Sequence, residues 1–256
     1  MSLQQAESDQ EQLPERAKHL LWLIALCNIC DARQVPNALF CEAATKATGL
    51  DDNFGVNADA VRQTNADKLG FYLQDIFANS KNQSTGQTSV TGQILRLGGK
   101  YDRNITDKWY GFGALDYEHD KLAGVKNRVL PQLGLGYHVI KSDPLTFDVF
   151  GGVAYNRTEF YTDPTYNKAE FMFGEESIHK ISATTTFRQR LAVFAPFSDA
   201  SDKYRLQFDA GLATAIIGGW NLVVNFTDRY NQAPASGKKK NDMLIFTGLQ
   251  YAWGPK

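Results

Sequence analysis

Three small groups of residues have the side-chain types of reactive sites, and each also has a plainer interpretation. Cys27 and Cys30 form a C-x-x-C pair, which is the spacing of a redox couple or of half a zinc site. The sequence holds no second pair of this kind, and its four histidines are scattered. We therefore favour an apolar segment that happens to contain cysteines, and we expect neither a metal site nor a cofactor.

Glu176, Ser177 and His179 have the residue types of a hydrolase triad. In a strand, residues 177 and 179 share a face with Cβ atoms about 6–7 Å apart, which is long for a nucleophile–base hydrogen bond. Asp116 and Glu118 also share a face and have the types of an acid–base pair, but ion pairs with Arg or Lys explain them more simply. We predict no catalytic residues and keep hydrolysis as the third functional alternative.

The overall composition excludes two classes of protein. Lys and Arg number 27 against 28 Asp and Glu, so the chain has no basic field for nucleic acid, and we expect no nucleic-acid partner. The longest apolar run, residues 20–27, is far shorter than the roughly 20 residues of a transmembrane helix. Aromatic residues at 12% and 21 glycines favour β structure, either soluble or in an outer membrane.

Residues 1–35 differ from the rest of the chain. A polar stretch precedes a basic flank at residues 16–19, a short apolar run and small residues at Cys30 and Ala32. This order is typical of an export signal. A short amphipathic helix explains the segment equally well, so both a leader and an N-terminal helix remain open.

Beyond residue 36, apolar and polar residues alternate. In the clearest segment, 204–212, every second residue is apolar, and Arg205 and Asp209 lie between them. Because successive side chains of a strand point to opposite faces, one face is apolar and the other polar. Short turns rich in Gly, Asn, Asp, Ser and Pro separate such segments. We predict about twelve strands, near residues 38–46, 54–63, 68–78, 91–103, 108–119, 127–140, 145–158, 169–178, 184–195, 203–214, 219–230 and 241–253.

These strands suit a membrane barrel better than a soluble sandwich. They are about 9–14 residues long, and a membrane-spanning strand needs about 9–11. Aromatic residues collect near their ends, as in the girdles of outer-membrane barrels. We predict an all-β fold, a closed antiparallel transmembrane β-barrel in residues 36–256. The alternative is a soluble periplasmic β-barrel that binds a small ligand.

Several segments resemble one family, the salt-induced outer-membrane proteins of Gram-negative bacteria, also known as domain of unknown function 481. The resemblance covers about residues 43–253 and is carried by the runs at residues 97–104, 111–118, 134–141, 147–155, 174–180, 228–231 and 238–242. It implies an outer-membrane barrel without assigned catalytic residues, and the family name implies a link to salt stress. The first hairpin of this chain departs from the family pattern at residues 49–52.

The polar face supplies the candidate site. A twelve-stranded barrel is narrower than the 16–18-stranded porins, so its lumen is either a small pore or a plugged network of ion pairs. We expect a structural role or a small-solute channel, a monomer, and contact with membrane lipid. The basic run at residues 238–240 is a candidate contact for lipopolysaccharide. The predicted lumen-lining residues are Arg96, Lys100, Asp102, Asp116, Glu118, Asp148, Arg188, Arg190, Arg205, Asp209 and Arg229.

Overall fold

The structure, a computed structural model, describes residues 39–48, 51–81, 88–198 and 203–253. These residues form twelve strands joined by turns and loops. The strands are β1 (Leu39–Thr48), β2 (Asp51–Gln63), β3 (Asp67–Lys81), β4 (Thr88–Asn104), β5 (Trp109–Asp120), β6 (Val125–Lys141), β7 (Leu145–Phe160), β8 (Tyr166–Lys180), β9 (Thr185–Pro196), β10 (Arg205–Ile217), β11 (Trp220–Asn231) and β12 (Asn241–Trp253).

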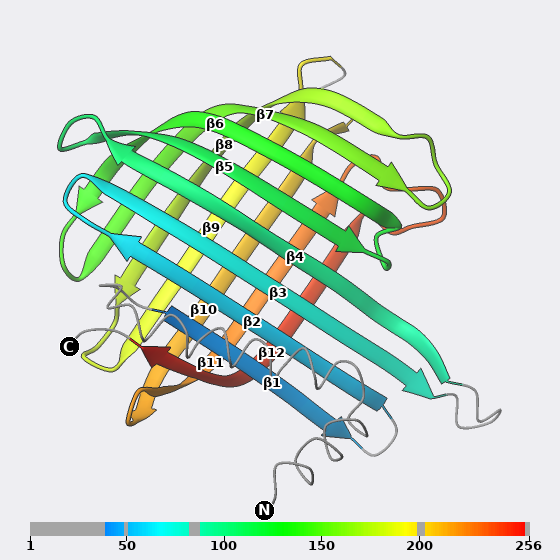
Figure 1. The fold of residues 1–256 in the computed structure, drawn as a ribbon, viewed down its shortest axis with the longest axis horizontal. Coiled ribbons are helices and arrows are strands. Elements are labelled where there is room, and N and C mark those ends of the chain that lie inside the picture. The colour runs from blue at the N-terminus through cyan, green and yellow to red at the C-terminus, as the bar shows by residue number, and fades with distance from the viewer. Residues whose placement is uncertain (1–38, 49–50, 82–87, 199–202, 254–256) are drawn as a thin grey trace, which may run out of the picture.

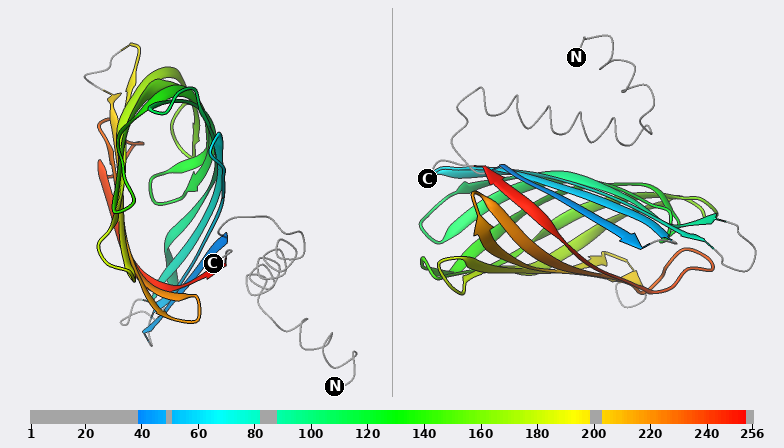
Figure 2. Two further views of the ribbon diagram at one scale, coloured as in Figure 1. Left: turned by 90° about the vertical axis from the view of Figure 1, so that its left-hand side faces the viewer. Right: turned by 90° about the horizontal axis from the view of Figure 1, so that it is seen from below.

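The strands form a closed antiparallel barrel in which each strand pairs with its neighbours in sequence (Figure 1). The ring is closed by β1 and β12, whose register runs over five residue pairs, from Leu39 opposite Trp253 to Ala43 opposite Leu249. Viewed along the barrel, the cross-section is flattened rather than round (Figure 2). Opposite walls are therefore closer together across the short dimension of the barrel than across the long one.

The two faces of the sheet differ as the alternation predicts. Along β6, the exposed fraction is 4% at Gln132 and 67% at Leu133. Large apolar side chains are exposed on the outer face of most strands. So extensive an apolar surface is unfavourable in contact with water and favourable in contact with lipid. The outward side chains include Phe71, Leu97, Leu115, Leu133, Leu135, Val149, Val153, Phe171, Phe173, Leu222, Val224, Ile245 and Leu249.

Aromatic rings inside the barrel lie against glycines of the next strand. Phe112 is paired with Gly134 and Phe150 with Gly174. A Cβ added at Gly134 would lie 2.6 Å from the Phe112 ring, and one added at Gly174 would lie 2.4 Å from the Phe150 ring. The inward glycines therefore make room for large rings in an interior too crowded for a second side chain.

The two ends of the barrel have different connections. At one end the connections span two to four residues, and the tightest, Gly218–Gly219, has the two positive φ angles of a two-residue hairpin turn. At the other end four of the six connections span five residues or more, and the one between β11 and β12 reaches nine. Because outer-membrane barrels have short periplasmic turns and longer outer loops, we place the long loops on the extracellular side.

Aromatic pairs mark both ends of the outer face. Near the periplasmic end, Trp109 packs on Tyr137 and Trp220 on Tyr251, each with ring centroids 5.0 Å apart. Near the extracellular end, the ring of Phe171 stacks on Phe197 at 4.2 Å. Amphipathic rings favour the boundary between lipid and water, so the two levels mark the edges of the membrane.

The sequence-based fold prediction is confirmed: the described chain is an all-β barrel of twelve strands. The strands run to as many as 17 residues, which is longer than predicted. The predicted leader or helix at residues 1–35 lies outside the described residues, so the division at residue 36 stays a prediction. No helix in the described part of the chain has the length and hydropathy of a transmembrane segment.

Candidate functional site

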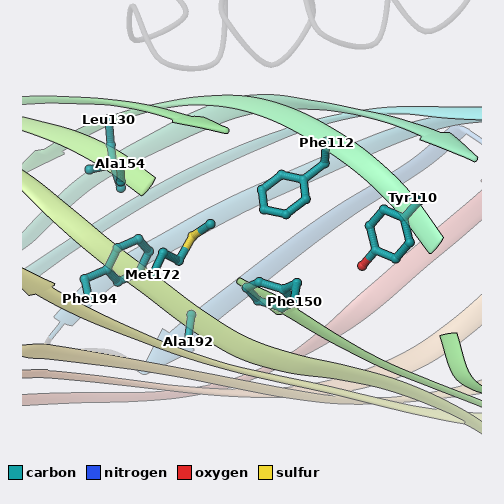
Figure 3. Packing of buried hydrophobic residues seen from close by; sticks show 8 residues of the cluster. All are labelled: Tyr110, Phe112, Leu130, Phe150, Ala154, Met172, Ala192 and Phe194. Atoms are coloured by element: carbon teal, nitrogen blue, oxygen red, sulfur yellow. The ribbon is translucent and has the colours of Figure 1, made fainter. Parts of the chain in front are cut away.

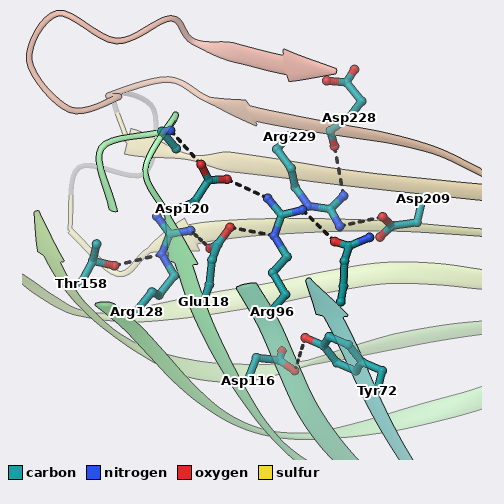
Figure 4. A network of polar contacts seen from close by, with 12 residues as sticks. Tyr72, Arg96, Asp116, Glu118, Asp120, Arg128, Thr158, Asp209, Asp228 and Arg229 are labelled. Atoms are coloured by element: carbon teal, nitrogen blue, oxygen red, sulfur yellow. Dashed lines mark hydrogen bonds and ion pairs between the residues drawn. The ribbon is translucent and has the colours of Figure 1, made fainter. Parts of the chain in front are cut away.

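The charged interior of the barrel is the candidate site, and its hub is Arg96 on β4 (Figure 4). Its Nε donates to Glu118 Oε1 at 2.9 Å, and its Nη2 donates to Asp120 Oδ2 at 3.0 Å. Nη1 donates to Gln74 on β3 at 3.2 Å. Glu118 also accepts a hydrogen bond from Arg128 on β6. Alternation aims these side chains inward, and the strand register sets them side by side.

From Arg128 the network continues along the inner wall towards β8. Arg128 Nε donates to Thr158 Oγ1 at 3.0 Å, and Thr158 in turn donates to Asn156 Oδ1 at 2.6 Å. Asn156 donates to Glu170 Oε1 at 2.9 Å, and Glu170 Oε2 accepts from Arg205 Nη2 at 2.6 Å. The result is a polar arc from β4 to β10 in the extracellular half of the barrel. Buried charges paired in this way are tolerated where isolated ones are not.

The opposite wall carries its own ion pair at the same level. Arg229 Nη2 lies 2.6 Å from Asp209 Oδ1, and Arg229 Nη1 donates to the carbonyl of Phe208 at 3.1 Å. A cavity of about 50 Å³ lies between the walls, bordered by Arg96 and Glu118 on one side and by Arg229 on the other. A water molecule needs at least about 10–15 Å³, so this cavity holds only a few. Side chains of both walls therefore border one small cavity in the lumen.

Asp116 differs from Glu118, its neighbour on the same face. The predicted ion pair is found for Glu118 alone. Asp116 instead accepts from Tyr72 Oη at 2.9 Å and from Gln132 Nε2 at 2.5 Å. A phenol and an amide thus solvate this carboxylate without neutralising its charge.

The periplasmic half of the interior is charged as well. Lys100 Nζ lies 2.9 Å from Asp102 Oδ1, and His138 Nδ1 lies 2.8 Å from Asp148 Oδ1. Arg188 and Arg190, by contrast, have no ion pair within 4.0 Å to any described side chain, although both arginines interact electrostatically with Glu176. Of the two, Arg188 is exposed and Arg190 is partly covered.

An apolar cluster also lies inside the barrel, and the sequence analysis did not predict it (Figure 3). It spans β5 to β9 and consists of Tyr110, Phe112, Leu130, Phe150, Ala154, Met172, Ala192 and Phe194. Cations cover its margins: the Arg205 guanidinium lies 4.8 Å from the centroid of the Phe194 ring, and Arg190 lies 5.2 Å from that of Phe150. The inner face is therefore partly dry, where we had expected charge and glycine.

The structure separates the residues of the suggested hydrolase triad. In the strand, Ser177 and His179 lie on the outward face, whereas Glu176 lies on the inward face near Lys100 and Arg190. A nucleophile, a base and an acid on two sides of one sheet cannot form a triad. No group of three metal-ligating side chains is found among the described residues.

The eleven predicted lumen residues all lie on the inner face, but several of their partners were missed. Asp120 continues the alternation of Asp116 and Glu118 on β5, so extending the pattern by one step would have found it. Arg128 lies on β6, where no lumen residue was predicted. Asn156 shares the face of the predicted Asp148 on β7, whereas Glu170 lies on β8, where no lumen residue was predicted. That these residues line a pathway for a solute is a proposal.

Comparison with protein families identifies the chain. The family described as "Protein of unknown function, DUF481" matches residues 42–253. The chain belongs to the DUF481 family. The resemblance inferred from the sequence is thereby confirmed. No curated protein matches the sequence of this DUF481 member.

Solved structures with a similar trace are outer-membrane barrels. The NanC porin is 9% identical, with a TM-score of 0.49 over 86% of this chain and 100% of that one. The translocator domain of the autotransporter NalP from Neisseria meningitidis is 12% identical, with a TM-score of 0.47 over 93% and 96%. The KdgM porin is 10% identical, with a TM-score of 0.44 over 84% and 98%.

The location of this DUF481 barrel follows from its own surface. All backbone groups of a closed barrel pair between strands, which is what a hydrocarbon environment requires. Its outer face is apolar between two aromatic levels. The protein is therefore an outer-membrane β-barrel, and the soluble periplasmic alternative is wrong because it would leave that face exposed to water.

Proposed function

We propose that this barrel is a narrow outer-membrane channel for ions and small polar solutes. The observation that carries the proposal is the charged inner wall, which extends from the Lys100–Asp102 pair near the periplasmic end to the Arg205–Glu170 pair near the extracellular end. A barrel with only a structural task needs no charge along its whole interior, since burying each pair costs desolvation energy.

The small cavity in the lumen favours a small solute. Its volume of about 50 Å³, between Arg96 and Arg229, has room for a few waters or a small ion. Both signs of charge line the wall, so the charge of the solute is selected locally rather than by a uniform field.

Single-channel recording in planar bilayers tests the proposal. We expect small, discrete conductance steps whose ion selectivity shifts towards cations in Arg188→Ala and in Arg190→Ala, because each change removes an inward positive charge without breaking a described ion pair. Arg157→Ala is the matched control, since its side chain is exposed on the outer side of β7. If the wild type, these variants and a barrel with a shortened β11–β12 loop all fail to conduct, the channel proposal is wrong and the barrel is plugged, with a structural role.

Lipid and lipopolysaccharide are the proposed partners of the outer surface. The apolar belt contacts lipid tails, and Lys239 and Lys240 are exposed on the extracellular loop, where lipopolysaccharide phosphates lie. We propose a monomer, which light scattering of the detergent complex tests. A role in salt stress is tested by comparing the amount of protein with and without added sodium chloride.

A further inference from the structure

The loop between β11 and β12, residues 232–240, reaches the opposite side of the barrel. In the ring of twelve strands, β11 and β12 stand six places from β5 and β6, which is as far apart as two hairpins can be. Nevertheless Lys238 Nζ donates to the carbonyl of Lys121, in the β5–β6 turn, at 3.3 Å. A loop that joins diametrically opposite hairpins must cross the mouth. Figure 1 shows it beside the ends of β6 and β7.

A second contact ties the same loop to the β7–β8 connection. Ser236 N donates to Asp163 Oδ2 at 2.7 Å, and Ser236 Oγ donates to Asp163 Oδ1 at 2.5 Å. Both oxygens of one carboxylate are thus held by one residue of the crossing loop. Hydrogen bonds to a charged group are stronger than neutral ones, yet at an exposed site they remain reversible.

Close packing accompanies these hydrogen bonds. Ala235 is buried, with 6% of its surface exposed. Gly124 lies directly against it, since a Cβ built at Gly124 would be 3.1 Å from Ala235 Cβ and 3.1 Å from Lys238 Cε. The positive φ of Gly124, 73°, also suits glycine. The β5–β6 turn is therefore shaped to receive the loop.

The surface on which the loop docks is joined to the charged network of the lumen. The N–H of Ala123, in the same turn, donates to Asp120 Oδ1 at 2.9 Å, and Asp120 Oδ2 accepts from Arg96 at 3.0 Å. A displacement of the turn would thus be felt by Arg96, the hub of the lumen network (Figure 4). The turn on which the loop docks is thus connected to Arg96 through two hydrogen bonds.

We propose that residues 232–240 form a strap that closes the extracellular mouth, with the Asp163–Ser236 contact as its latch. The proposal rests on the proposed channel function, because a strap gates only a barrel that conducts. Release of the latch lets the strap swing back over its own hairpin, which opens the mouth. The gate is therefore operated from outside the cell.

Two single substitutions and a loop replacement test gating. We expect Asp163→Ala to raise the open probability about tenfold, because it removes both hydrogen bonds of the latch. Ser236→Ala should raise it less, because it removes only the hydrogen bond donated by the hydroxyl, and the double variant should match Asp163→Ala. Replacement of residues 233–239 by Asn-Gly should leave the channel open throughout. Ser182→Ala is the matched control: its hydroxyl accepts from two backbone N–H groups, but in a periplasmic turn.

A cross-link reports the strap independently of conductance. In a background with Cys27, Cys30 and Cys41 replaced by serine, Asp163→Cys with Ser236→Cys should form a disulfide in intact membranes and hold the channel shut until it is reduced. The strap proposal is wrong if the disulfide does not form. It is also wrong if neither the disulfide nor the loop replacement changes the conductance. A cross-link that forms in a barrel that never conducts, even without residues 233–239, supports the strap geometry and overturns the channel.

Discussion

The ring of Phe150 lies on the backbone of Gly174, its cross-strand partner, so closely that a methyl group at position 174 would meet ring carbon at 2.4 Å. The same hypothetical carbon would lie 2.4 Å from the carbonyl oxygen of Leu191. The ring can move but the carbonyl belongs to the sheet, so the barrel cannot relax without shifting a strand. The glycine is thus a structural requirement of the inner aromatic cluster.

Gly174→Ala should therefore destabilise the barrel by about 1–3 kcal/mol, the usual cost of overpacking a dense interior. Gly70→Ala is the control, because a Cβ at that position on β3 meets nothing within 4 Å. Denaturant unfolding in detergent micelles, followed by the heat-dependent shift in gel mobility, measures the difference. Equal midpoints for the two variants would contradict the packing described here.

The lipid-facing side is tested by placing a charge on it. Leu133 is 67% exposed in the middle of β6, so Leu133→Arg should cost about 2–4 kcal/mol if the side chain meets hydrocarbon. Leu122→Arg is the matched control, since Leu122 is 45% exposed in the β5–β6 turn, outside the belt. Folding into lipid vesicles gives the comparison. If Leu133→Arg is as harmless as the control, water rather than lipid covers this face.

Arg96 holds two carboxylates beside the small lumen cavity, and its removal should both enlarge that cavity and weaken the fold. Arg96→Ala leaves Glu118 and Asp120 short of a partner, and breaking such a pair costs about 3 kcal/mol where water is scarce. Arg62→Ala should cost less than about 1 kcal/mol, because Arg62 is 47% exposed and lies 4.0 Å from Asp67.

The functional result for Arg96→Ala is a larger single-channel conductance, since the side chain borders the narrow cavity. Arg96→Lys should restore most of the barrier to ion passage, because it restores the positive charge, although a lysine cannot reproduce the geometry of the two hydrogen bonds to Glu118 and Asp120. Conductance steps of equal size in Arg96→Ala and Arg62→Ala would show that the narrowest point lies elsewhere.

The latch of the strap gives a pH dependence with a definite sign. The hydrogen bonds donated by Ser236 lower the pKa of Asp163 below its usual 3.8. A carboxyl with a lower pKa in the closed state stabilises that state above the ordinary pKa, and the stabilisation is lost as the pH falls through the lowered value. We expect a constant open probability from about pH 8 to about pH 5 and a rise only below about pH 4.

The two sides of the membrane should respond differently to acid. On the periplasmic side, Lys180 lowers the pKa of Asp143 in the β6–β7 turn, but this turn has no contact with the strap. Acidification of the extracellular chamber alone should therefore open the channel, and Asp163→Asn should remove the response. An equal response from both chambers would place the titrating group elsewhere.

The alternation of residues predicted the strands closely because it is a local property. In residues 204–212 each apolar residue is two places from the next, and the strand must turn that set to one side whatever the rest of the chain does. The same reasoning placed Arg96 and Glu118 on the inner face. It failed for the inner aromatic cluster, because no charge marks the inner face at these positions: Phe112 is flanked by two glycines, and Phe150 lies between Val149 and a pair of glycines.

Which charges meet was decided only by the closed fold. Arg205 and Glu170 are 35 residues apart and are joined across an intervening strand, so their contact depends on the register of two strand pairs. Lys238 meets Lys121 over a separation of 117 residues, because the barrel closes and a nine-residue loop spans its mouth. The alternation of residues determines which face of the sheet a side chain points to. Its neighbour across the lumen depends on the shear and closure of the barrel, which are set by the registers of all the strand pairs together.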